Sequence, residues 1–160
     1  MKILTPVVLL LVGCSAPDEG VDTESNADTA WMELGRVEGV VKRTAELTGD
    51  GVGNLIVTAF FATTPASNQQ PHNGIALLNV DFSDPDAEVS FVLENFFPEP
   101  EPYYFLAVFD EDNSLMKDFT WHPSEGDLLS GPVDSGEGEP HWIASGEVLS
   151  LSLELSEVAD

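Results

Sequence analysis

The chain contains 160 residues, of which 29 are acidic and five are basic, so its formal net charge at pH 7 is -24. This imbalance argues against nucleic acids and anionic lipid headgroups as partners recognised through charge, because both require a cationic surface. The length suits one domain with a hydrophobic core, and the single cysteine, Cys14, leaves no disulfide to stabilise it. The core or a bound metal must therefore stabilise the fold.

Residues 1–13 have the layout of a secretory signal peptide. Lys2 precedes an almost unbroken apolar run from Ile3 to Val12. A transmembrane helix needs about 20 consecutive apolar residues, so this run is too short to span a bilayer. The segment is therefore expected to direct export and then to be removed.

Three residues at the end of this segment, Leu11, Val12 and Gly13, precede Cys14 in a pattern that resembles the lipobox of bacterial lipoproteins. The resemblance implies cleavage before Cys14, a diacylglyceryl thioether on its sulfur and usually a further acyl chain on the new amino group. Two or more acyl chains hold a protein stably on a membrane, whereas one chain binds only marginally. Ser15 after the cysteine fits the sorting of many Gram-negative lipoproteins to the outer membrane. The face of that membrane on which the protein would lie is left open. The alternative is an ordinary signal peptide with a chance cysteine near its cleavage site.

Residues 14–31 are expected to form a disordered tether that begins at the acylated cysteine. Between residues 15 and 30 the chain has five carboxylates, no cation and one aliphatic residue larger than alanine, Val21. Such a segment cannot bury enough apolar surface to fold. Removal of Lys2 leaves four cations against the 29 acidic residues, a net charge of -25. The anchor would thus hold near the bilayer a domain that anionic headgroups repel.

The body, residues 32–158, is predicted to consist of β-strands separated by turns. The first strand contains Gly35 and Gly39, which weaken a strand and predict an edge position or a bulge. The second and fifth strands are apolar on both faces, as central strands are. In the last strand four leucines alternate with polar residues, so one face is predicted to lie on the core. In chain order, the strands are expected at residues 32–42, 55–63, 75–82, 88–93, 103–109 and 149–156.

Short strands at regular spacing, separated by turns such as the one at Asp50 and Gly51, are typical of an antiparallel β-sandwich. No run of helical periodicity follows Cys14. We therefore expect an all-β fold with a single antiparallel β-sandwich, immunoglobulin-like or transthyretin-like, over residues 32–158. A closed barrel is the alternative architecture.

An acidic loop after the aromatic fifth strand is the candidate metal site. Asp110, Asp112, Ser114 and Asp118 supply hard oxygen ligands, which Ca²⁺ prefers. Their spacing resembles the first, third, fifth and ninth positions of an EF-hand loop. The alternative is a solvated acidic turn whose side chains accept hydrogen bonds from local backbone groups.

Two departures reject the EF-hand itself. Leu115 stands where the EF-hand needs glycine, and Trp121 stands where it needs a bidentate glutamate. A looser resemblance links residues 103–118 and 126–128 to small exported bacterial β-sandwich domains, in which an aromatic strand runs into an acidic loop. This resemblance implies a fold and no particular activity.

The chain lacks the motifs of common enzyme classes. It has no GxSxG elbow, no P-loop, no dinucleotide fingerprint and no thiol nucleophile once Cys14 is acylated. We therefore expect a lipid-anchored protein of the cell envelope with a non-catalytic binding or structural module, stabilised by Ca²⁺ if the acidic loop binds it. The alternative is a small envelope-anchored hydrolase or carbohydrate-active domain. The membrane is the only partner that the sequence identifies, and a protein or glycan partner is left open.

Overall fold

The computed structural model describes residues 33–62, 71–98, 101–115, 123–131 and 139–160. The predicted anchor at Cys14, the tether, Asp118 and Trp121 lie outside these residues. Within them, no helix is long and apolar enough to cross a membrane. The same residues form eight strands: β1 (Gly35–Arg43), β2 (Val52–Phe61), β3 (Asn73–Asp81), β4 (Glu88–Phe96), β5 (Tyr103–Asp110), β6 (Leu128–Leu129), β7 (Val148–Leu155) and β8 (Glu157–Val158). The predicted all-β class is confirmed, and each of the six predicted strands has a counterpart.

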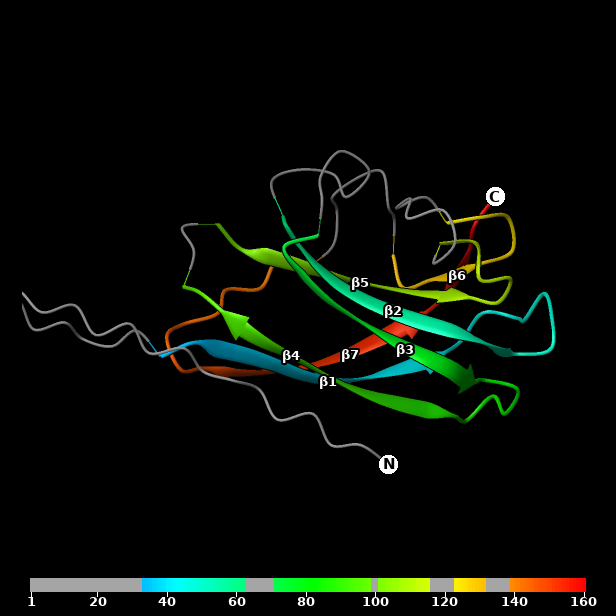
Figure 1. Cartoon of the computed structure of the whole chain (residues 1–160), viewed down its shortest axis with the longest axis horizontal. Coiled ribbons are helices and arrows are strands. Elements are labelled where there is room, and N and C mark those ends of the chain that lie inside the picture. Colours follow the sequence, from blue (N-terminus) through cyan, green and yellow to red (C-terminus); the bar gives the residue numbers. More distant parts are fainter. Residues whose placement is uncertain (1–32, 63–70, 99–100, 116–122, 132–138) are drawn as a thin grey trace, which may run out of the picture. The chain divides into compact units, whose positions relative to one another are not determined.

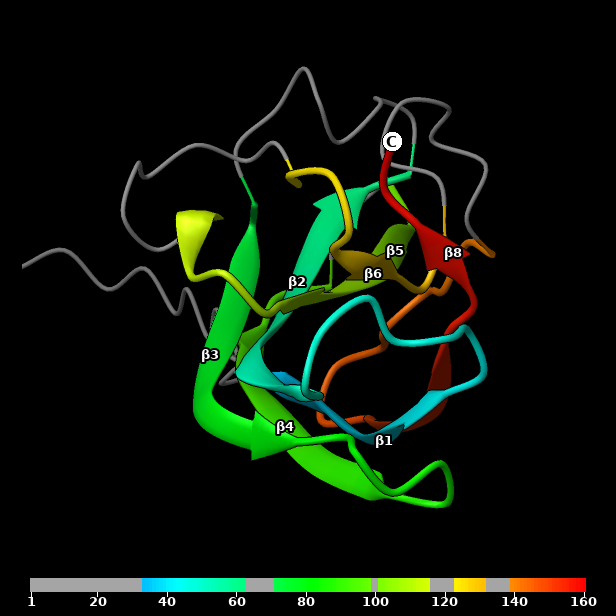
Figure 2. The same ribbon diagram turned by 90° about the vertical axis from the view of Figure 1, so that its right-hand side faces the viewer.

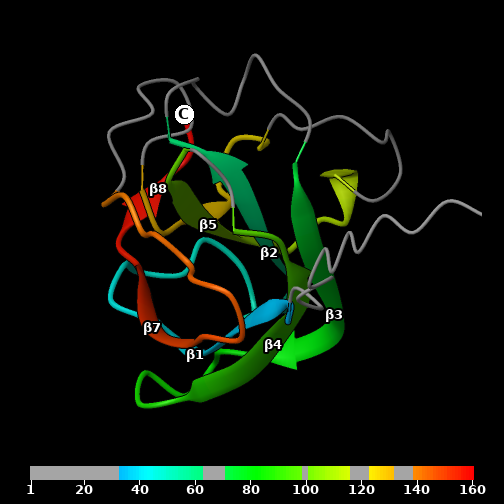
Figure 3. The same cartoon turned by 90° about the vertical axis from the view of Figure 1, so that its left-hand side faces the viewer.

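Two packed sheets form the body (Figure 1). One sheet has three strands in the order β4-β1-β7, and the other has five in the order β3-β2-β5-β6-β8. Figures 2 and 3 show the two sheets facing each other. Apolar side chains from both sheets fill the space between them, and the largest of those that are fully buried include Leu55, Phe82, Phe96, Phe109 and Leu155. The architecture is therefore sandwich-like.

The three-stranded sheet is mixed, so the prediction of an antiparallel sandwich is wrong for one pair of strands. β1 pairs antiparallel with β4 but parallel with β7, in unbroken register from Arg36 opposite Val148 to Arg43 opposite Leu155. The alternation of leucine and serine in β7 is the same beside a parallel or an antiparallel neighbour. The direction of the pairing depends on the path of the chain between the sheets, which this pattern does not report.

β1 is the central strand of its sheet, so the predicted edge position is wrong. The register of β1 with β4 shifts between Gly35 and Val37, but the extra residue lies in β4, so the bulge predicted for β1 lies on its partner strand. Gly39 lies under the ring of Phe91, and a Cβ at this position would come within 2.6 Å of the Phe91 Cζ atom. Gly39 therefore allows the close approach of β4 to β1.

The predicted central strands, β2 and β5, are buried on both faces. Every residue of β5 is buried, as are six consecutive residues of β2. Their inner face packs in the core between the sheets, and their outer face forms a second cluster that includes Ile56, Phe60, Leu106 and Val108. The prediction from their two-sided apolar pattern is confirmed.

Candidate metal site at the end of β5

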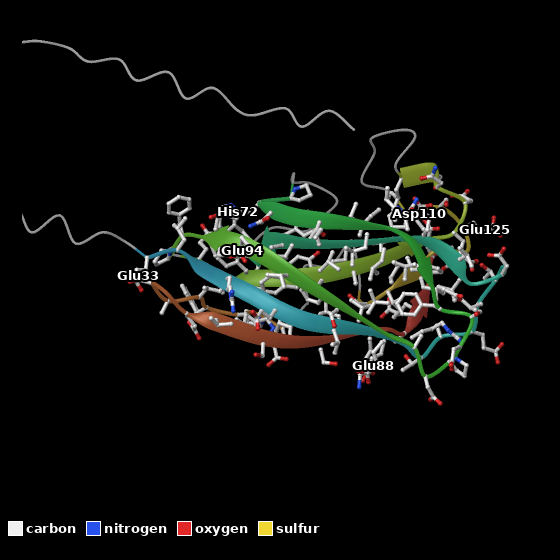
Figure 4. The ribbon with its side chains drawn as sticks, turned by 60° about the horizontal axis from the view of Figure 1, so that its bottom comes forward. Glu33, His72, Glu88, Glu94, Asp110 and Glu125 are labelled. Carbon is white, nitrogen blue, oxygen red and sulfur yellow. The ribbon has the colours of Figure 1, made fainter. Side chains whose placement is uncertain are left out.

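The pairing of β5 with β6 places two aspartates opposite each other. Phe109 pairs with Leu128 in an antiparallel ladder. Asp110 is the last residue of β5 and Asp127 is the residue before β6, so they occupy the next opposing positions of this ladder. Figure 4 shows Asp110 at the end of the body where Glu125 also lies.

Asp112 joins these two aspartates in one cluster. Asp110, Asp112 and Asp127 each offer a carboxylate oxygen, and these oxygens lie within 4.8 Å of one another. Asp110 is 0% exposed and Asp127 is 2% exposed, whereas Asp112 reaches solvent. The cluster thus combines two buried carboxylates with one at the surface, the arrangement of a cation site that opens to solvent.

One oxygen of Asp110 has no hydrogen-bond partner among the described residues. Its Oδ1 accepts a hydrogen bond from the backbone N–H of Ser114 at 3.0 Å. Its Oδ2 is buried, and nothing in the described part of the chain donates to it. A buried carboxylate oxygen without a donor is costly, and a bound ion is one of the few explanations for it.

Two tight turns hold the other carboxylates in place. Asn113 adopts a left-handed conformation with φ of 61°, and the next N–H, of Ser114, donates to Asp112 Oδ1 at 2.8 Å. In the second turn, Gly126 has a φ of 98° and the N–H of Ser124 donates to Asp127 Oδ2 at 2.8 Å. Asparagine and glycine tolerate positive φ, which is why the chain can turn at these positions.

The loop between β1 and β2, which connects one sheet to the other, completes the surroundings of the cluster. Glu111 accepts a hydrogen bond from the backbone N–H of Gly51 at 2.7 Å, and the Thr48 hydroxyl lies 3.0 Å from the carbonyl oxygen of Gly126. A cavity of about 270 Å³ lies between this loop and the two turns. Asp50 and Glu125 also line it, so further carboxylates surround the cluster.

The electrostatics of the cluster favour a bound cation. Burial raises the pKa of Asp127 to about 6, and the neighbouring charge of Asp110 adds to this increase. Burial, followed by the side chain of Asp112, also raises the pKa of Asp110. Burial and the neighbouring carboxylates therefore disfavour the ionised forms of Asp110 and Asp127, an effect that a bound cation would offset.

The ion pairs of the described residues lie elsewhere. Lys42 pairs with Glu88 at 2.8 Å, and Arg36 pairs with Glu38. The third described cation, Arg43, donates to the carbonyl oxygen of Phe82 at 3.1 Å. None of the described basic side chains therefore neutralises the cluster.

The structure brings together part of the predicted ligand set. Asp110 and Asp112 converge as predicted, whereas Asp118 lies outside the described residues. Ser114 lies in the same loop, and its hydroxyl is 2.9 Å from the hydroxyl of Ser124, so it links the two turns. The prediction missed Asp127, although its position between a turn glycine and two leucines was a signal for a carboxylate at a strand end.

The donors fit a hard divalent cation. Three carboxylates offer up to six oxygens, and Ca²⁺ takes six to eight oxygen ligands at about 2.3 to 2.6 Å, with water completing the set. The residues lack the histidine and thiolate ligands that softer transition metals prefer. No family model, curated protein or solved structure matches this chain, so the site stands on its own geometry.

Proposed function

We propose that the chain is a lipid-anchored protein of the bacterial cell envelope whose sandwich-like body is a non-catalytic binding or structural module stabilised by Ca²⁺. Asp110, Asp112 and Asp127 hold the ion. The lipobox pattern that ends at Cys14 supports the anchor and a location at the outer membrane. The observation that carries the proposal for the ion is the buried Oδ2 of Asp110, which has no hydrogen-bond partner in the part of the chain that the structure describes.

The ion acts as a link between separate parts of the chain. Asp110 ends β5, Asp112 belongs to the loop after it, and Asp127 precedes β6. Each turn already directs hydrogen bonds to its own carboxylate, so the loops are shaped before the ion binds. Ca²⁺ then replaces the repulsion between three carboxylates with attraction to a common charge.

Thermal unfolding with and without Ca²⁺ tests the cation site. Calcium sites of extracellular modules have Kd values of about 10⁻⁴ to 10⁻³ M. At 10 mM Ca²⁺, binding to the folded state alone then adds about 1.4 to 2.7 kcal/mol of stability. For a body of this size the Tm is expected to rise by about 5 to 10 °C. The reference sample contains NaCl at the same ionic strength.

Two matched variants localise the effect. Asp127→Asn is expected to abolish most of the Ca²⁺-dependent rise in Tm, because it removes one ligand charge. Without Ca²⁺ the same variant is expected to be at least as stable as the unchanged chain at pH 7, since it also removes a buried like charge. Asp86→Asn, an exposed residue of the β3–β4 turn, should keep the full response. A full response in Asp127→Asn, or none in the unchanged chain, would contradict the proposal.

A further inference from the structure

Asn73 is followed directly by Gly74 at the start of β3, whereas every other asparagine of the sequence is followed by a residue with a side chain. The side-chain amide of an asparagine can react with the backbone nitrogen of the next residue. Glycine hinders this approach least, because it has no Cβ and its backbone is the most flexible. The pair of Asn73 and Gly74 is therefore the position in the sequence where this reaction meets the least steric hindrance.

The backbone N–H of Gly74 takes no part in the β-ladder. β3 is an edge strand whose one paired neighbour is β2. Just after β2 the N–H of Ala62 donates to the carbonyl oxygen of Pro102, so even-numbered residues of β2 bond toward β5 and odd-numbered residues bond toward β3. Gly74 lies opposite Thr58, an even-numbered residue, so the N–H of Gly74 points away from β2.

This N–H instead contacts the side chain with which it would react. It donates to Oδ1 of Asn73 at 2.8 Å. Because a C=O bond is about 1.2 Å long, Cγ of Asn73 lies within about 4 Å of the Gly74 nitrogen. Reacting atoms in a near-attack arrangement are about 3–3.5 Å apart. Gly74 is exposed and Asn73 is the first residue of β3, so local opening at the strand end suffices to bring the two atoms together.

We propose that Asn73 is a site of spontaneous deamidation. Hydroxide from the solvent takes the proton of the Gly74 N–H, and the nitrogen attacks Cγ of Asn73. The new N–Cγ bond forms, the Cγ–Nδ2 bond breaks, and Nδ2 leaves as ammonia after it takes a proton from water. Water then opens the resulting cyclic imide at either of its two carbonyl groups. The products are an aspartate or an isoaspartate in place of Asn73, and no oxidant or reductant takes part.

The amide group that is lost connects the two sheets. Nδ2 of Asn73 donates to the backbone carbonyl oxygen of Glu94 at 2.6 Å, and Figure 4 shows Glu94 close to His72, the residue before Asn73. β3 belongs to the five-stranded sheet and β4, which contains Glu94, belongs to the three-stranded sheet. An ionised carboxylate only accepts hydrogen bonds, so it cannot replace this donor. Deamidation therefore removes a contact between the sheets.

Asn113, which precedes Ser114, provides an internal control. The N–H of Ser114 donates to Oδ1 of Asp110 at 3.0 Å and to Oδ1 of Asp112 at 2.8 Å. The Oδ1 atom of Asn113 accepts a hydrogen bond from Nδ2 of Asn54 at 2.7 Å. Other residues thus hold both the nitrogen and the amide that would have to react. The fold is therefore expected to protect Asn113 but not Asn73.

Peptide mass spectrometry of the full-length chain, aged for several weeks in mildly alkaline buffer, measures both sites. We expect Asn73 to convert into aspartate and isoaspartate at a rate within a few-fold of its rate in the urea-unfolded chain. Asn113 is expected to convert many times more slowly in the folded chain than in the unfolded one. Protection of Asn73 by the fold to the same degree as Asn113 would overturn the proposal.

Two variants at the same position complete the test. Asn73→Gln keeps an amide but closes the ring much more slowly, so isoelectric focusing of the aged variant should lack an acidic form that the aged unchanged chain contains. Asn73→Asp is expected to have a lower Tm than the unchanged chain, because it lacks the donor to Glu94. The same acidic form in equal amount in Asn73→Gln would overturn the proposed site. An unaltered Tm in Asn73→Asp would overturn its proposed effect on the contact between the sheets.

Discussion

At the scale of single residues, Asp127 links the stability of the body to pH. Burial and the neighbouring Asp110 raise the pKa of Asp127 to about 6, compared with an ordinary value of 3.8. A carboxyl whose pKa is higher in the folded state binds its proton more tightly there. Its contribution to stability is complete below the unfolded pKa and is lost as the pH rises through about 6.

The metal-free protein should therefore become more stable as the pH falls from 7.5 to 5. From the pKa of Asp127, this residue contributes about 1 kcal/mol to that change. The free energy of unfolding, measured by urea denaturation in the presence of EDTA, gives the total change, which also includes relief of general acidic repulsion. Asp127→Asn isolates the contribution of Asp127, because the variant keeps all other acidic residues. Its free energy of unfolding should increase by about 1 kcal/mol less than that of the unchanged chain over the same pH range. An equal gain in the two proteins would show that Asp127 does not titrate in this range.

At the scale of elements, Gly39 decides how closely three strands approach. A Cβ at this position would lie 2.6 Å from the Leu151 carbonyl oxygen of β7 and 2.6 Å from the Phe91 ring of β4. Both neighbours would have to move, and one of them is backbone. The absence of a side chain in the centre of β1 is therefore a packing requirement of the sheet.

Gly39→Ala is expected to destabilise the body by about 1 to 3 kcal/mol, the usual cost of forcing extra volume into a packed interior. The urea midpoint measures this loss. Gly131→Ala serves as control, because a Cβ there would meet no atom of the other described residues within 4 Å. If both variants unfold at the same midpoint as the unchanged chain, the close packing of β4, β1 and β7 around Gly39 is incorrect.

At the scale of the whole molecule, the lipobox pattern predicts that Cys14 carries acyl chains. In bacteria grown with a labelled fatty acid, the unchanged chain should incorporate label and partition into the detergent phase. Cys14→Ala should incorporate none, because the thioether cannot form. A variant labelled as strongly as the unchanged chain would exclude Cys14 as the acylation site. Asp127→Asn should still be labelled, since the anchor and the cation site are chemically independent.

The sequence by itself determined the class of the fold and the approximate positions of six strands. Alternation in β7 and the two-sided apolar runs of β2 and β5 reflect whether each face is buried, a property that neighbouring residues encode locally. The acidic loop after β5 could be predicted for the same reason, because Asp110 and Asp112 are close in the chain. β6 and β8 were not predicted, because two residues are too few to show the alternation of a strand.

Only the tertiary structure decided the parallel pairing of β1 with β7 and the position of Asp127 beside Asp110. Both depend on contacts between residues that are distant in the sequence, and an alternating pattern is satisfied by many partners and either direction. The pairing of Phe109 with Leu128 placed a second buried carboxylate against the predicted loop. Local sequence patterns do not specify this long-range register. The register brings Asp127 beside the acidic loop, and the three aspartates together form the candidate cation site.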